Sequence, residues 1–369
     1  MKKDLLKILS LSALFLGTSM VFSSCDDDKE DDKVNPEPII DPVETVKKMY
    51  ILNEGIFKSN NSTLDLYLPD TKTFESKVYA SQNAEVIGDT GQDLIVVGDK
   101  LFLSVFGSNY LAKLDSNGKL IEKYSFSQEE GQPRFLAFKD NSLYVSLYSG
   151  QIAKFDTASL DKPVAYVTVG NNPEQIAIKD NFLVVCNSQL DNVPDNRISI
   201  VDLSNFTLSK NIETSYGNFQ SVAVVNDSVY VTYYTPTYSI EMLNVDINSG
   251  VVRPSGAATK MLEYNNNLYC ANVATVYDEN RNATTNTSFF VRNVNTGKDT
   301  PILDLSATPE LATATVYLFD IDSDTHDLYI GTTDYKTNGT IYRFDKDGKL
   351  LDKFETSSIS PSKAVFLVN

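Results

Sequence analysis

Histidine is almost absent from this sequence of 369 residues, and its scarcity narrows the chemistry available to the protein. A zinc site of the HExxH type needs two histidines, so the single residue His326 excludes it. A Ser-His-Asp triad would have one candidate base. However, His326 lies in "IDSDTHDLYI", which predicts a solvent-exposed turn. The phosphate-binding pattern GxxxxGK[ST] is absent as well, which argues against a P-loop nucleotide site.

Cysteine is scarce too, with three residues in the whole chain. Cys25 follows an apolar N-terminal run, whereas Cys186 ("FLVVCNS") and Cys270 ("NLYCANV") lie inside strand-like apolar runs. Because a free thiol behaves as a small hydrophobic group, we predict that Cys186 and Cys270 are free and buried. A disulfide between them is the alternative.

Positively charged residues are fewer than negatively charged ones. The chain has 32 lysines and arginines against 49 aspartates and glutamates, which gives a formal net charge of −17. An acidic surface repels the phosphate backbone of DNA and RNA, so we expect no nucleic-acid partner.

Long hydrophobic runs are missing everywhere except at the N-terminus, where Lys2 and Lys3 precede "LLKILSLSALFLGTSMVF". This order predicts a signal peptide over residues 1–24, with a retained membrane anchor as the alternative. Residues 25–48 ("CDDDKEDDKVNPEPIIDPVETVKK") are acidic and contain proline, a composition typical of a flexible tether.

The small residues before Cys25 and the acidic run after it resemble the lipoprotein signals of Bacteroidetes-type bacteria. The resemblance implies that Cys25 is the lipidated first residue of the mature protein, exposed on the outer face of the outer membrane. A lipidated cysteine anchors a soluble domain without spanning the bilayer, so membrane contact is expected through this anchor alone.

A repeat is the most prominent feature of the rest of the chain. Strand-like segments related to "NSLYVSLYS" begin at seven positions separated by 39 to 60 residues, namely Met49, Leu101, Leu143, Phe182, Val229, Leu268 and Leu328. Each is followed by further short alternating strands and by turns such as "DSNGK" and "KDNS". Four short strands at this period indicate the blade of a β-propeller. We therefore predict an all-β, seven-bladed propeller over residues 49–369, with six blades or a β-sandwich as alternatives.

Closure of the ring is also predicted. The last segment, "SKAVFLVN", matches the pattern of the innermost strand, whereas the first segment, "MYILNEG", matches the second strand of a blade. The C-terminal strand should therefore complete the first blade and remove two exposed sheet edges.

Candidate binding residues follow from this topology, because the loop before each first strand and the loop after each second strand share one face. The positions just before or at the start of the first strands should ring the central channel, and they are Gln92, Asp93, Arg134, Glu174, Gln175, Gln220, Thr259, Lys260, Tyr317 and Lys363. The positions at or after the ends of the second strands are Asn53, Phe57, Phe106, Tyr148, Asn187, Tyr233, Tyr234, Asn272, Thr333 and Tyr335. The long insertions fall on the same face, and the amides and aromatic rings suit a large ligand with mixed apolar and polar edges.

Several stretches, "YILNEGIFKSNNSTLDLYLPDTKTF", "GDTGQDLIVVGDKLFLSV" and "NNPEQIAI", resemble the YncE-like propeller lipoproteins of Bacteroidetes, and in particular the BtuG type. The resemblance covers the chain from about residue 49 to its end. It implies a protein without enzymatic activity or catalytic cofactor that captures cobalamin (vitamin B12) at the cell surface. It also implies a partner, an outer-membrane transporter of the TonB-dependent type that receives the ligand.

Two other functions remain open from the residues. A propeller enzyme that uses a metal ion would need several carboxylates converging on the channel, with Asp93 and Glu174 as candidates. Nearby Arg134, Lys260 and Lys363 would dilute that negative potential. The aromatic loops would also suit an adhesin or assembly subunit that binds a glycan or another protein.

Overall fold

The computed structural model describes residues 47–280 and 283–368. The predicted signal peptide, Cys25 and most of the predicted tether lie outside these residues. The first strand, β1, begins at Lys47, two residues before the predicted start of the propeller.

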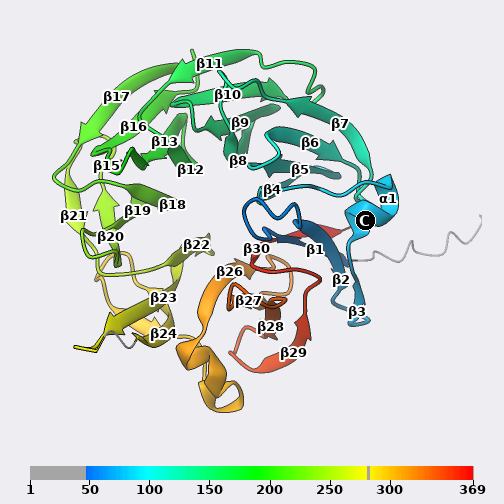
Figure 1. The fold of residues 1–369 in the computed structure, drawn as a ribbon. Helices are drawn as coiled ribbons and strands as arrows, with labels where there is room; N and C mark the ends of the chain where they lie inside the picture. Colours follow the sequence, from blue (N-terminus) through cyan, green and yellow to red (C-terminus); the bar gives the residue numbers. More distant parts are fainter. Residues whose placement is uncertain (1–46, 281–282, 369) are drawn as a thin grey trace, which may run out of the picture. The chain divides into compact units, whose positions relative to one another are not determined.

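The described residues form seven four-stranded antiparallel sheets, which confirms the predicted seven-bladed propeller (Figure 1). From the innermost strand outward, the first blade contains β30 (Pro361–Val368), β1 (Lys47–Asn53), β2 (Thr63–Leu68) and β3 (Thr73–Glu75). The second contains β4 (Gly91–Val97), β5 (Lys100–Val105), β6 (Tyr110–Leu114) and β7 (Leu120–Ser125). The third contains β8 (Pro133–Lys139), β9 (Ser142–Leu147), β10 (Gln151–Asp156) and β11 (Ala165–Thr168).

The remaining four blades follow the same order. The fourth contains β12 (Pro173–Lys179), β13 (Phe182–Asn187), β16 (Arg197–Asp202) and β17 (Thr207–Glu213). The fifth contains β18 (Phe219–Val225), β19 (Ser228–Tyr234), β20 (Ile240–Val245) and β21 (Val252–Pro254). The sixth contains β22 (Lys260–Tyr264), β23 (Asn267–Tyr277), β24 (Ala283–Arg292) and β25 (Asp299–Pro301). The seventh contains β26 (Thr315–Ile321), β27 (Leu328–Thr333), β28 (Thr340–Phe344) and β29 (Leu350–Glu355).

The ring closes as predicted. β30 pairs antiparallel with β1, with Lys47 opposite Val368 and Tyr50 opposite Val365. Each innermost strand also contacts the innermost strands of both neighbouring blades, including the contacts of β30 with β4 and β26. The C-terminal strand therefore supplies the inner edge of the first blade and leaves no open seam in the ring.

The degree to which a strand is buried depends on its position within its blade. The second strands β5, β9 and β13 are buried along almost their whole length, because neighbouring blades cover both of their faces. The outermost strand β7 instead alternates between exposed and half-buried residues. The core therefore lies between blades; one cluster, for example, joins Leu52 and Leu64 of the first blade to Leu103 and Val105 of the second. Cys186 and Cys270 lie in such interfaces as free, buried thiols, as predicted.

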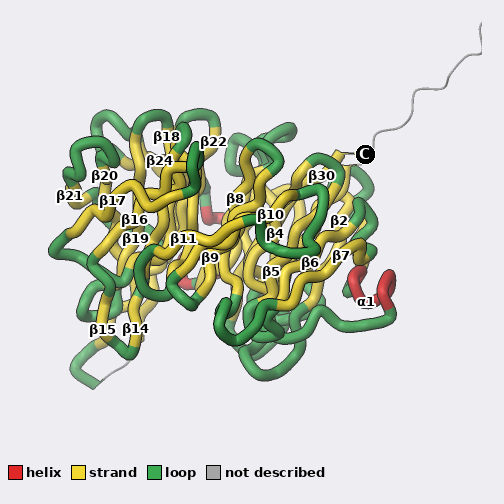
Figure 2. The backbone as a smooth tube through the Cα atoms, turned by 90° about the horizontal axis from the view of Figure 1, so that it is seen from above, coloured by secondary structure: helices red, strands yellow, loops and turns green. Residues whose placement is uncertain are grey.

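The two faces of the propeller differ in the length of their loops (Figure 2). We call the face where the second strands end the mouth face, and the opposite one the turn face. In the second to sixth blades, the turn between the first and second strands has two residues; Asp140 and Asn141, for example, both have positive φ angles, as a type I′ hairpin requires. His326 lies in the turn between β26 and β27 on this turn face.

The mouth face carries the long connections. They include residues 54–62, the small hairpin of β14 (Gln189–Leu190) and β15 (Val193–Pro194), and the part of the β23–β24 hairpin that runs beyond its neighbours. A short helix, α1 (Val78–Asn83), and two 3₁₀ turns (Leu305–Ala307 and Pro309–Thr313) also lie in connections between blades. Among the described residues, no helix is long and apolar enough to cross a membrane.

Candidate functional site

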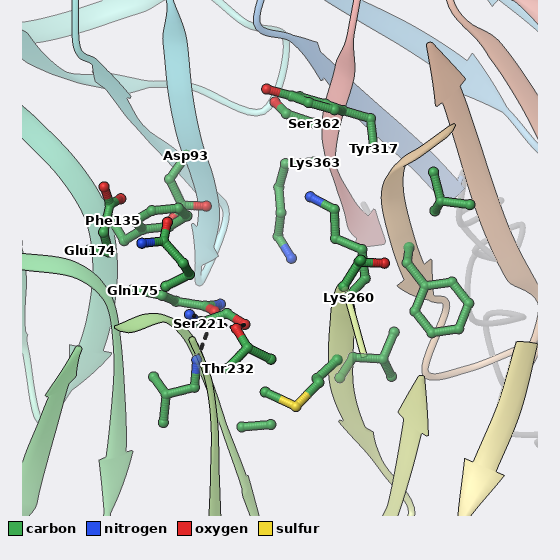
Figure 3. A pocket seen from close by; sticks show the side chains of 18 of the residues that line it. Asp93, Phe135, Glu174, Gln175, Ser221, Thr232, Lys260, Tyr317, Ser362 and Lys363 are labelled. Atoms are coloured by element: carbon green, nitrogen blue, oxygen red, sulfur yellow. Dashed lines mark hydrogen bonds between the residues drawn. The ribbon is translucent and has the colours of Figure 1, made fainter. Parts of the chain in front are cut away.

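A central cavity of about 740 Å³ lies inside the ring of innermost strands and is bounded on the mouth face by the long loops. All seven blades contribute to its wall. Figure 3 shows side chains from several of them pointing into one common space. The polar and charged residues of the wall are Glu54, Gln92, Asp93, Arg134, Glu174, Gln175, Gln220, Ser221, Thr232, Tyr234, Thr259, Lys260, Glu263, Thr315, Tyr317, Asp320, Tyr335, Ser362 and Lys363.

A β-bulge lies at the mouth end of most of the innermost strands, where many of the polar wall residues lie. In six of the seven blades the register between the first and second strands shifts at this point. A regular strand would turn one of two consecutive side chains away from the channel, whereas a bulge re-aims it. As a result, neighbours in sequence such as Glu174 and Gln175, or Gln220 and Ser221, both line the cavity.

Arg134 organises one side of the cavity. Its guanidinium forms an ion pair with Glu174, at 2.6 Å between Nη2 and Oε2, and donates a further hydrogen bond to the side-chain oxygen of Gln92. The guanidinium also stacks over two aromatic rings, 5.0 Å from the centroid of Phe106 and 4.9 Å from that of Tyr148. The Tyr148 hydroxyl donates to the other oxygen of Glu174. The ion pair, the hydrogen bonds and the ring contacts therefore fix these side chains relative to one another, so this wall has a defined geometry before any ligand binds.

Two lysines and three further carboxylates also face the cavity, namely Lys260, Lys363, Glu54, Asp93 and Asp320. Lys363 forms an ion pair with Asp320 at 2.7 Å. The hydroxyl of Tyr317 donates to Glu54, and burial raises the pKa of Glu54 although Tyr317, Arg134 and Lys260 oppose the shift. Burial also raises the pKa of Asp93 to about 6, against the opposing effect of Lys363. Burial in the cavity therefore favours the protonated forms of Glu54 and Asp93.

A second pocket of about 440 Å³ adjoins the central cavity on the mouth face. The two share Glu174, Gln220 and Tyr234, so together they form one continuous surface. Tyr148 and the loop residue Tyr238 line the second pocket, and Tyr238 is 85% exposed. Exposed aromatic side chains on loops of other blades extend this mouth-face surface, namely Phe57 and Tyr335.

The structure brings many of the predicted binding residues to the cavity. Gln92, Asp93, Arg134, Gln175, Gln220, Tyr234, Tyr317 and Lys363 all line it, together with Glu174, Thr259, Lys260 and Tyr335. Tyr148 lines the adjoining pocket, Phe106 packs against Arg134 and Tyr148, and Phe57 lies 6.1 Å from Phe106 between ring centroids.

Other candidates lie at the mouth end of their strands but outside the cavity. Asn53 and Asn187 are fully buried and donate to third-strand residues of their own blades, Asn53 to Asp65 at 2.8 Å and Asn187 to Ser199 at 2.9 Å. Tyr233 is buried in the core and donates to Glu241. Asn272 lines a separate pocket near Arg292, and Thr333 is buried.

Three charged residues of the wall, Glu54, Glu263 and Asp320, were not among the candidates taken from the sequence. Glu54 directly follows β1, between the candidates Asn53 and Phe57, so the rule that selected the ends of second strands could have found it. Asp320 lies near the far end of β26, and the pattern of the strand alone did not reveal that it faces the channel. Within residues 47–280 and 283–368, no group of three or more histidine, cysteine, aspartate or glutamate side chains is arranged to hold a metal ion.

Solved structures with a similar fold share little sequence with this chain. A candidate 6-phosphogluconolactonase from Bacteroides uniformis is 12% identical with a TM-score of 0.60, and the match covers 87% of this chain and 99% of that protein. Apo AztD from Citrobacter koseri is 11% identical with a TM-score of 0.53, covering 88% and 98%. Hydrazine synthase from Kuenenia stuttgartiensis is 15% identical with a TM-score of 0.56, covering 73% and 92%.

The similarity to these solved structures shows the fold alone. No curated protein matches the sequence. Residues 47–367, almost the whole propeller, match the model of a family described as a domain of unknown function, DUF5074. This seven-bladed propeller therefore belongs to the DUF5074 family.

Proposed function

We propose that this protein is a lipid-anchored surface protein that binds cobalamin at the mouth face of its propeller and passes it to an outer-membrane transporter of the TonB-dependent type. The resemblance of three sequence stretches to cobalamin-capturing lipoproteins suggests the ligand. The observation that carries the proposal is the continuous polar and aromatic surface formed by the central cavity and the pocket beside it. Cobalamin is broad and bears several amide side arms, so it needs amide partners spread over a wide site.

The glutamines of the cavity are arranged to supply such partners. Gln92 accepts a hydrogen bond from Arg134, Gln175 accepts one from the backbone of Val222 at 3.0 Å, and Gln220 donates to Asn218 at 2.8 Å. Within the described part of the chain, no hydrogen bond uses the Nε2 of Gln92 or Gln175 or the Oε1 of Gln220. One end of each amide is therefore held by the protein while the other end remains available to a ligand amide.

The position of the single histidine determines how the ligand would be held. His326 lies on the turn face, and the chain contains no other imidazole. The cobalt of a ligand on the mouth face would therefore gain no imidazole from the protein, and binding would rest on the periphery of the corrin ring.

The attachment of the tether is compatible with transfer of the ligand. Lys47, the first described residue, lies at the turn-face end of β1. A tether that runs from a lipidated Cys25 to this point would join the propeller on the side away from the mouth. The loops of the mouth face are then not the place where the chain enters the propeller.

Titration of residues 36–369 with cyanocobalamin tests the proposal. This fragment contains the complete closed ring, and we expect one ligand per propeller, recovered chemically unchanged. Gln175→Ala should weaken binding about 5- to 15-fold, since it removes one hydrogen-bonding amide from the site. The matched variant Gln128→Ala, at an exposed position outside the cavity, should bind like the wild type. Absence of binding at micromolar protein, or equal effects of the two substitutions, would contradict the proposal.

A further inference from the structure

The three cations of the cavity differ in how their charge is balanced. Arg134 is paired with Glu174, and Lys363 is paired with Asp320. Lys260 at the start of β22 forms no ion pair with any carboxylate of residues 47–280 or 283–368. Its ammonium group lies over the ring of Tyr317, 4.9 Å from the centroid, a contact that only partly replaces hydration.

The carboxylates nearest to Lys260 are already engaged with other groups. Glu54 accepts the hydroxyl of Tyr317. Asp320 accepts both the ammonium of Lys363 and the backbone N–H of Ala364, the latter at 2.9 Å. Figure 3 shows the amino groups of Lys260 and Lys363 directed into the same central space. Among the described residues, Lys260 is therefore the cavity cation that lacks a direct ion pair, although Glu54 and Asp320 lie near enough to act on its charge.

The surroundings of Lys260 make its unpaired charge costly. Burial in the cavity lowers the pKa of Lys260; Glu54 and Asp320 oppose the shift, whereas the neighbouring Lys363 adds to it. A ligand oxyanion at this point would give Lys260 a direct counter-ion and form charge-assisted hydrogen bonds, which are stronger than those between neutral groups.

We propose that Lys260, with Lys363 beside it, forms an oxyanion subsite that receives a phosphate or carboxylate group of the bound ligand. The identity of the group rests on the proposed function: cobalamin carries a single phosphate, in the arm that bears its nucleotide. The subsite would fix the orientation of that arm, whereas the glutamines would hold the amides of the ring.

Paired ligands test this subsite. Cyanocobalamin has the phosphate, whereas cyanocobinamide lacks both the phosphate and the nucleotide. Lys260→Met should weaken binding of cyanocobalamin about 10- to 100-fold and change binding of cyanocobinamide less than about twofold. The control Lys346→Met alters an exposed lysine between β28 and β29 on the turn face and should affect neither ligand. Equal losses for both ligands, or no loss for cyanocobalamin, would overturn the subsite. Neither result would contradict the proposal that the wild-type protein binds cobalamin.

If the wild type binds neither ligand, the proposed function fails. A second measurement then tests the oxyanion subsite by itself. The amine of Lys260 is labelled with acetic anhydride, with and without inorganic phosphate, and the modification is followed by peptide mass spectrometry. Slower labelling of Lys260 in phosphate, with unchanged labelling of Lys346, would support an oxyanion subsite for a different ligand. Equal protection of both lysines, or protection of neither, would overturn it.

Discussion

Asp93 shows how a single residue links the cavity to the stability of the fold. Its carboxylate is buried and accepts the backbone N–H groups of Leu94 and Leu136, both at 2.9 Å. Burial raises its pKa from 3.8 to about 6, while Lys363 and the two N–H groups act in the opposite direction. The carboxyl group therefore favours its protonated form more strongly in the folded protein than in the unfolded chain.

This pKa predicts a pH dependence of stability. Between about pH 4 and pH 6 the folded protein retains a proton on Asp93 that the unfolded chain has lost. Folding therefore takes up a proton in this range, and the contribution of Asp93 to the free energy of unfolding decreases as the pH rises. Urea unfolding at pH 4, 5, 6 and 7 should show this decrease in the wild type relative to Asp93→Asn. The control, Asp70→Asn at an exposed position, should follow the wild-type curve. A wild-type curve parallel to that of Asp93→Asn would contradict the assignment.

Single residues also show which side-chain orientations the sequence could not predict. The position of a residue relative to the first strand was enough to place Gln92, Arg134 and Gln175 at the cavity. The same reasoning placed Asn53 and Asn187 at the mouth end of their strands, but their side chains turn into their own blades to bind third-strand residues. This orientation depends on a partner on the next strand of the sheet, 12 residues away in both cases, so the pattern of the strand itself could not reveal it.

At the scale of elements, β30 connects the two ends of the propeller. Leu367 on this strand is buried in the cluster between the first and second blades, whereas the next residue, Val368, is 53% exposed. The two residues lie on the same strand but on opposite faces, which makes them a matched pair for testing closure.

We expect Leu367→Ala to lower the free energy of unfolding by about 2–5 kcal/mol, because it leaves a cavity at the seam of the ring. Val368→Ala should change it by less than about 0.5 kcal/mol. Chemical denaturation of residues 36–369 measures both values. Similar effects for the two variants would show that this strand does not hold the ring closed.

The β-bulges are the elements that sequence patterns could not predict. Alternating apolar residues correctly indicated the innermost strands, but strict alternation would direct only one of each consecutive pair into the channel. The register shifts at Pro133/Leu136 and Pro173/Ile176 bring both members of a pair to the wall. One of these pairs, Glu174 and Gln175, is polar at both positions.

At the scale of the whole molecule, the fold was far more predictable than the ligand. The number of blades followed from counting repeats, and closure followed from the match between the first and last segments, since every blade has the same four-strand plan. The shape of the cavity depends on loops whose lengths and sequences differ from blade to blade. The repeat pattern describes what the blades share, so it could not predict these differences between their loops.

The most direct measurement is a crystal structure of residues 36–369 grown with cyanocobalamin, in which anomalous scattering locates the cobalt. We expect one cobalt peak per propeller on the mouth face, above the cavity lined by Arg134, Gln175 and Lys260, with no protein imidazole bound to it. A peak on the turn face, or no peak at saturating ligand, would contradict the proposal that this propeller captures cobalamin at its mouth.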